Sequence, residues 1–219
     1  MSSTLATIIL ATRSRARVEM LARAGITFDT VPSNVDERAV DAPMIAGGAS
    51  PTDIAVRLAE AKALAVAEQY PECQWVIGAD QVLEVDGKRL TKPPDRAAAR
   101  HQLQVLAGRT HQLHTAVAIA RRDSIAWRHC DVPALTMRSL GPKEIDAYLD
   151  AVGETIYGSV GAYQIEGQGI QLFARVAGDY FSILGLPLLP LLTWLRSVGA
   201  IGIMETSTLT LVEDMEKRR

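Results

Sequence analysis

Residues 5–17 read LATIILATRSRAR, an apolar run followed directly by a polar turn and the start of a helix. The run from Leu5 to Ala11 is typical of a central, buried strand. Thr12 to Ser14 then supplies hydroxyl groups and a turn. From Arg15 onward apolar residues return at helical spacing, and Gly25 ends the pattern. This strand, turn and helix predict a fold of the α/β class.

The rest of the chain continues to alternate helical and extended patterns. We expect further strands at 26–31, 75–85, 112–121, 124–137 and 171–176, and helices at 52–69, 95–106, 142–150 and 186–198. Residues 33–51 and the glycine-rich 153–169 are expected to be loops. The pair Asp86 and Gly87 indicates a hairpin turn. Alternating elements early and paired strands later predict a mixed sheet flanked by helices.

Composition excludes several classes of protein. The 219 residues are 48% hydrophobic and 22% charged, which excludes wholesale disorder. The length suits one domain of above-average size, or one domain with a cleft between lobes. We expect that domain at 1–199 and a weakly structured tail at 200–219. The net charge of −2 does not favour a nucleic-acid partner. Prolines and glycine interrupt the apolar residues 183–195, so no membrane span is expected. Two cysteines without metal spacing favour a reduced, cytoplasmic protein.

The turn and first helical residues, 12–17, form the first candidate site. Four arginines, at 13, 15, 17 and 23, lie close together, and free N–H groups at a helix N-terminus bind phosphate. Arg13 and Arg17 are four residues apart, so both side chains can point to one side. An alternative is structural: Ser14 caps the helix and Arg15 pairs with Glu19 on a solvated face. The pattern alone leaves both interpretations open.

Two acidic positions form the second candidate. Asp80 lies in the apolar strand 75–85, and a buried carboxylate needs a metal, a cation or water as its partner. Beside a phosphate site it could hold Mg²⁺ or activate water. The alternative is a strand-end aspartate that accepts backbone N–H groups. Asp36 and Glu37 could supply a second hard ligand, or they could be solvated loop acids.

Single residues elsewhere are weaker candidates. Lys92 precedes Pro93 and so lies on extended backbone, where it is either a point charge for a phosphate or a surface lysine. Lys62 on the alanine-rich helix has the same two interpretations. Glu166 in the glycine-rich segment could read the donor edge of a base, or the segment could be purely structural. The four histidines lack zinc-ligand spacing and are interpreted as structural.

Taken in this order, the segments resemble the Maf family of nucleoside triphosphate pyrophosphatases over residues 5–199. The matching stretches are 10–21, 35–37, 57–63, 77–82, 92–93, 106–111, 161–169 and 178–187. The resemblance implies an elongated mixed β-sheet flanked by helices with a central cleft, related to inosine triphosphatases. It also implies hydrolysis of a nucleoside triphosphate between the α- and β-phosphates, giving a monophosphate and pyrophosphate with a divalent cation.

The resemblance assigns roles by position. Asp80 would be the base that activates water, and Asp80 and Glu37 would hold the metal ion (Mg²⁺, Mn²⁺ or Co²⁺). The phosphates would be held by Thr12, Ser14, Arg17, Lys62 and Lys92. These roles suit phosphoryl transfer, which needs charge neutralisation and in-line water more than a covalent nucleophile. The family also implies a homodimer.

Three positions bear on which nucleotide base the substrate carries. Family members that act on dTTP and UTP usually have two adjacent arginines, a threonine after the catalytic aspartate and a glutamine in the glycine loop. Here those positions are Ala16, Gln81 and Glu166, and the latter two resemble the branch that acts on 7-methyl-GTP, which often has an aromatic residue at position 16. The alternatives are a dTTP/UTP pyrophosphatase and a non-catalytic nucleotide-binding regulator. A structural DNA-associated protein has little support from the charge.

Overall fold

The long apolar strand β3 (Trp75–Val85) forms the centre of the sheet, with nine of its eleven residues buried. In this computed structural model, which describes residues 7–202, β1 (Ile8–Ala11) pairs with β3 in parallel. On the other side β5 (Thr110–Arg121) pairs with β3 antiparallel over nine residue pairs. The sheet is therefore mixed, as its sequence pattern predicts.

Within residues 7–202, eight strands make up the sheet. The main order is β2-β1-β3-β5-β7-β8, with β4 beside β3 and β6 beside β5. The remaining strands are β2 (Asp29–Thr30), β4 (Lys88–Leu90), β6 (Ser124–Asp131), β7 (Ala134–Met137) and β8 (Phe173–Ala177). The hairpin expected at Asp86 and Gly87 is present, and it returns the chain into the short strand β4.

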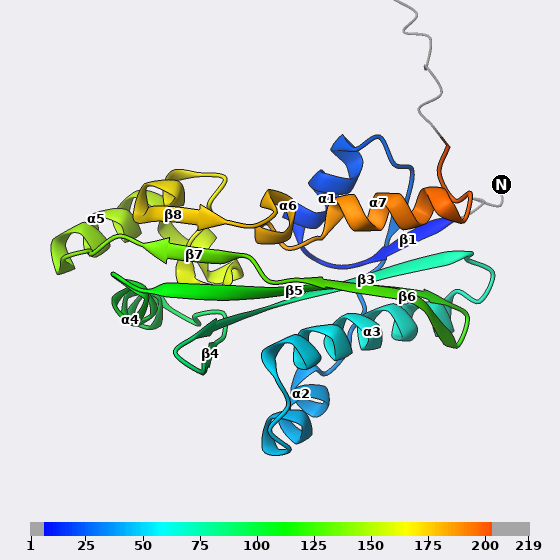
Figure 1. The fold of residues 1–219 in the computed structure, drawn as a ribbon, viewed down its shortest axis with the longest axis horizontal. Coiled ribbons are helices and arrows are strands. Elements are labelled where there is room, and N and C mark those ends of the chain that lie inside the picture. The colour runs from blue at the N-terminus through cyan, green and yellow to red at the C-terminus, as the bar shows by residue number, and fades with distance from the viewer. Residues whose placement is uncertain (1–6, 203–219) are drawn as a thin grey trace, which may run out of the picture.

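Helices lie on both sides of this sheet, and the molecule is elongated (Figure 1). On one side lie α1 (Arg15–Arg23), α6 (Tyr180–Ile183) and α7 (Leu188–Ser197); on the other lie α2 (Glu37–Ala46) and α3 (Pro51–Gln69). One end of the sheet carries α4 (Arg96–Leu106) and α5 (Pro142–Val152). The fold expected from the sequence, an elongated mixed sheet between helices, is confirmed.

The alternation of side chains along β3 decides which residues meet. Ile77 and Ala79 pack with the core of α1 and α7, whereas Val76 and Val82 pack with residues of α3. Gly78 lies on the α3 side, where an added Cβ would come within 2.2 Å of the Ala59 carbonyl oxygen. The missing side chain lets the α3 backbone approach β3. By the same alternation, residue 80 faces α3 and residue 81 faces α6.

Several expectations about elements were wrong. Residues 33–51 are not one loop, since they contain α2, which the Asp36 carboxylate caps and which tolerates Pro43 in its interior. The expected strand 124–137 is two strands, because the segment with Pro133 separates β6 from β7. The glycine-rich segment 153–169 is not wholly irregular. It contains short 3₁₀ helices at Gly153–Gly158 and Val160–Ala162, and a third begins within it at Gln168–Leu172.

Three further expectations concern a membrane span, the two cysteines and the C-terminal tail. Within residues 7–202 no helix is both long and apolar enough to cross a membrane. Cys73 is buried and Cys130 is partly buried. Most of the expected tail, from residue 203 to 219, lies outside the described residues.

Candidate active site

A cavity of about 820 Å³ opens where β1 ends and runs past the middle of β3. The ten residues that the family resemblance connects with catalysis, phosphate binding or the base all line it: Thr12, Ser14, Ala16, Arg17, Glu37, Lys62, Asp80, Gln81, Lys92 and Glu166. Its charged lining consists of seven basic side chains and four acidic ones. The volume suits a small-molecule ligand, and the excess of positive charge favours an anionic one.

The turn after β1 combines the two interpretations considered for it, because Ser14 caps α1 and the Arg17 side chain lines the cavity. The Ser14 hydroxyl caps α1 by accepting from the Arg17 backbone N–H at 3.5 Å, and the Ser14 N–H donates to Thr12 Oγ1 at 3.0 Å. Arg15 pairs with Glu19 on the exposed side of the helix. The capping interpretation is therefore correct for Ser14 and Arg15. It does not use the Arg17 side chain, which turns into the cavity.

Asp80 meets its partner on α3. Lys62 Nζ lies 2.6 Å from Asp80 Oδ1 and 2.6 Å from Glu37 Oε1, so one ammonium group joins the two carboxylates. Lys62 and Asp80 are both buried, whereas the Glu37 side chain is 51% exposed. Asp80 is the central residue of β3, which excludes the alternative of a strand-end aspartate. Asp36, the neighbour of Glu37, is used as the cap of α2 instead.

The two carboxylates differ in their electrostatics. Burial raises the pKa of Asp80 above its ordinary value, although Lys62 and Arg17 oppose the rise. Burial also raises the pKa of Glu37, but the hydrogen bond and charge of Lys62, with the charges of Lys92 and Arg17, outweigh it and leave this pKa low. Asp80 is therefore the better proton acceptor near neutral pH, while Glu37 stays ionised.

The same two carboxylates fit a divalent cation. They converge on one positive group, and carboxylate oxygens are the ligands that Mg²⁺ takes, typically one or two of them together with substrate phosphates and water. In the part of the chain that the structure describes, no cluster of three or more His, Cys, Asp or Glu side chains could hold a metal alone. A metal at Asp80 and Glu37 would therefore complete its shell with phosphate oxygens and water.

Three charged residues at the cavity were missed in the sequence: Arg38, Asp41 and Arg89. Arg89 on β4 donates from Nη1 to Asp41 Oδ2 on α2 at 2.6 Å, and both line the cavity. The available signal was the turn at Asp86 and Gly87, which returns the chain alongside β3 and places residue 89 near the site. Without an expected helix at 37–46, Asp41 had no assigned position.

The three residues considered for recognition of the nucleotide base all line the cavity, but they differ in whether a polar group is open to a ligand. Gln81 Nε2 lies 2.9 Å from Thr115 Oγ1 and 3.0 and 3.1 Å from the carbonyl oxygens of Ser182 and Ile183. Its donor group is thus occupied by the protein. Glu166 is exposed at the cavity, so its carboxylate is open to a ligand. Ala16 contributes a small side chain beside Arg17.

The histidines contribute to packing and hydrogen bonds. His111 Nε2 is paired with the Tyr163 hydroxyl at 2.7 Å, and His114 Nδ1 with the Thr52 hydroxyl at 2.8 Å. Burial lowers the pKa of His111 to about 4, so the ring is neutral at pH 7. His129 lies 2.8 Å from Asp131. His101 is exposed on α4.

Comparison with known proteins agrees with the ordered motifs. A family model described as Maf-like protein matches residues 7–198. The chain belongs to the Maf family. This Maf protein is 50% identical over 194 residues to a protein of Mesorhizobium japonicum named 7-methyl-GTP pyrophosphatase, covering 89% of this chain and 97% of that one. A Brucella abortus protein of the same name is 50% identical over 189 residues, covering 86% and 94%. A Nitrobacter hamburgensis protein named nucleoside triphosphate pyrophosphatase is 49% identical over 196 residues, covering 90% and 96%.

Proposed function

We propose that this Maf protein is a nucleoside triphosphate pyrophosphatase, which hydrolyses its substrate to a nucleoside monophosphate and pyrophosphate. The observation that carries the proposal is the meeting of Asp80, Glu37 and Lys62 in a cavity with an excess of basic residues. The names of the relatives support the same reaction class. The domain that carries it is inferred to be residues 1–199.

The residues divide the work of the reaction. The hydroxyls of Thr12 and Ser14, with the free N–H groups at the start of α1, bind phosphate oxygens, and Arg17 and Lys92 neutralise their charge. Asp80, whose pKa is raised by burial, accepts a proton from the attacking water. Lys62 holds that carboxylate in place. Charge neutralisation and positioning provide most of the catalysis in such reactions.

A divalent cation belongs to this proposal. Mg²⁺, Mn²⁺ or Co²⁺, held by Asp80 and Glu37 together with phosphate oxygens, would neutralise the charge that develops on the phosphates. The ordinary test is metal removal: a chelator abolishes turnover and added Mg²⁺ or Mn²⁺ restores it. Turnover that is unchanged after chelation would refute the metal requirement.

We infer that the preferred substrate is 7-methyl-GTP or another modified purine nucleotide. The exposed Glu166 carboxylate can accept from the N1–H and amino group of guanine, and it is complementary to the positive charge of 7-methylguanine. A pyrimidine O4 would be repelled instead. Glu166→Gln should lower the ratio of kcat/KM for 7-methyl-GTP over dTTP by about tenfold, the scale of one charge-assisted hydrogen bond. A wild-type preference for dTTP or UTP would favour the alternative substrate class.

The deciding experiment is a product assay on a panel of nucleoside triphosphates with Mg²⁺ or Mn²⁺. We expect pyrophosphate, and we expect Asp80→Asn to lower turnover at least ~100-fold, the usual scale for a lost general base. Asp123→Asn, an exposed aspartate in the turn after β5, is the matched control and should change little. If the wild type binds nucleotides but turns none over, the chain is the non-catalytic regulator considered above.

Two further inferences complete the proposal. We infer a homodimer, which sedimentation at several concentrations would test. We also infer a cytoplasmic location, because a chain with only two cysteines and no metal-ligand spacing between them suits a reducing compartment. Fractionation of cells expressing the full chain would test it.

A further inference from the structure

A row of three polar side chains crosses the sheet on the face away from α3. Gln81 on β3 lies opposite Thr115 on β5, which in turn lies opposite Asp131 on β6. Residues in direct register share one face of a sheet, so all three point toward α6. Thr115 is fully buried, and its neighbours Val117 and Ile119 on this face belong to the apolar core. Polar side chains in such a place need partners.

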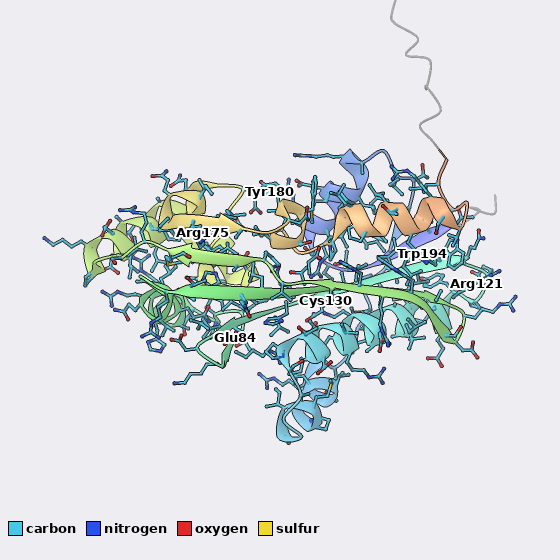
Figure 2. All side chains as sticks on the ribbon, in the orientation of Figure 1. Glu84, Arg121, Cys130, Arg175, Tyr180 and Trp194 are labelled. Carbon is cyan, nitrogen blue, oxygen red and sulfur yellow. The ribbon has the colours of Figure 1, made fainter. Side chains whose placement is uncertain are left out.

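The partners of this polar row lie in α6. Gln81 donates to the carbonyl oxygens of Ser182 and Ile183, as described above. Ser182 is fully buried, and its Oγ lies 2.6 Å from Asp131 Oδ2 and 3.0 Å from Asp179 Oδ1. The Ser182 backbone N–H already satisfies Asp179 at 2.8 Å, so the single hydroxyl proton goes to Asp131. The polar row therefore holds α6 from both its backbone and its side chain. Figure 2 marks this helix by Tyr180 and marks β6 by Cys130.

The segment after α6 reaches the phosphate end of the cavity. Gly185, with φ of +108°, presents its carbonyl oxygen to Arg17 Nε at 2.7 Å. Arg17 lines the cavity, and its charge partly opposes the rise that burial causes in the pKa of Asp80. Nε is occupied by this bond, so the terminal nitrogens of the guanidinium are the ones directed to a ligand. The position of Gly185 thus decides where the guanidinium points.

We propose that Asp131 is a positioning residue: through Ser182 and α6 it holds the Gly185 carbonyl, and through that carbonyl it aims Arg17 at the triphosphate. Its other oxygen is held by His129 at 2.8 Å, so the carboxylate itself has a fixed orientation. Asp131 lies on β6, outside the residues that line the cavity, so it would act on a bound nucleotide only through other residues. The inference rests on the proposed function for its kinetic consequence, but the contact between Gly185 and Arg17 can be observed without turnover.

A purely structural role for Asp131 predicts something different. If the carboxylate only stabilised α6, then its loss would impair the enzyme equally with or without the Arg17 side chain. If it acts through Arg17, the two losses overlap, and a double-mutant cycle is non-additive. The cycle therefore separates the two roles.

The test uses the full chain with Asp131→Ala, Asp131→Asn, Arg17→Ala and the Asp131→Ala/Arg17→Ala pair. Arg128→Ala is the matched control, because it removes an ion pair on the same strand but toward α3. We expect Asp131→Ala to lower kcat/KM for pyrophosphate release about tenfold, the scale of one charge-assisted hydrogen bond. In the Arg17→Ala background the same change should cost less than about twofold. Asp131→Asn keeps an oxygen acceptor for Ser182 and should recover most of the loss.

A second measurement follows the Arg17 Nε–H signal by NMR, assigned by its absence in Arg17→Ala. We expect faster solvent exchange of this proton in Asp131→Ala and no change in Arg128→Ala. An unchanged signal in Asp131→Ala, or an equal loss of kcat/KM in both backgrounds, would overturn the proposal. If the wild type released no pyrophosphate, the proposed function would fail while the NMR result still decided the positioning role.

Discussion

Replacing Gly78 with alanine tests how closely α3 must approach β3. The added Cβ would lie 2.2 Å from the Ala59 carbonyl oxygen and 2.6 Å from the Ala63 backbone nitrogen. Both neighbours are backbone atoms of one helix, so no side-chain rotation relieves the overlap. The helix must therefore move away from the strand by about an ångström, to reach ordinary contact distances.

The cost of that movement follows from the packing it disturbs. Ala59, Ala63 and Leu58 of α3 are fully buried against the sheet. Overpacking of a core costs typically 1–3 kcal/mol, and we expect about 3 kcal/mol because the overlap is with backbone. For a chain of this size that corresponds to a fall in Tm of about 6–12 °C. Activity should fall as well, because Lys62 moves with α3 and its 2.6 Å contact with Asp80 lengthens.

The assay is thermal unfolding followed by circular dichroism, with urea unfolding to obtain the free energy. Gly158→Ala is the matched control for stability, since an added Cβ there meets no atom within 4 Å. A Gly78→Ala protein within about 2 °C of the wild type would refute the reasoning. It would mean that α3 and β3 adapt to the methyl group at little cost.

Three further predictions concern charges. Lys62→Met removes the cation beside Asp80 and should raise the pKa of that carboxyl further. The rising limb of the kcat/KM–pH profile should therefore move to higher pH, and an unmoved limb would exclude Asp80 as the base. Burial lowers the pKa of His111 from 6.5 to about 4. On acidification the unfolded chain therefore takes up a proton first, and the free energy of unfolding should fall between about pH 6.5 and pH 4 by up to about 3 kcal/mol. His111→Gln should flatten this part of the stability curve, measured as Tm against pH. Arg89→Ala removes the ion pair with Asp41. Because α2 contains no buried residue, its backbone amide hydrogen exchange should become faster, and unchanged exchange would show that other contacts hold α2.

The parts of the fold that follow from local patterns were predictable. The strand expected at 75–85 has those bounds in the structure, and the helix expected at 52–69 begins one residue earlier. The capping of α1 by Ser14 also follows from a local signal. By contrast, α2 contains no buried residue and includes Pro43, so it presents neither the apolar stripe nor the uninterrupted run that indicates a helix. A four-residue helix such as α6 is too short for any periodicity to be seen.

The sequence was sufficient to predict which residues belong to the site, but not which of them contact one another. The ordered motifs identified ten residues, and the fold brings all ten to one cavity. That Lys62 joins Asp80 to Glu37 depends on the approach of α3 to β3, which no local pattern encodes. Likewise, the donor group of Gln81 is occupied by α6, about a hundred residues later in the chain. Such partners are decided by tertiary packing, so a base-reading role could be suggested for residue 81 but its occupied amide could not.

The most direct test of the account identifies the products of 7-methyl-GTP hydrolysis by the wild type and by Asp80→Asn. The account predicts nucleoside monophosphate and pyrophosphate in equal amounts from the wild type, with turnover at least ~100-fold lower in the variant. Release of orthophosphate as the first product, or a variant as active as the wild type, would contradict it.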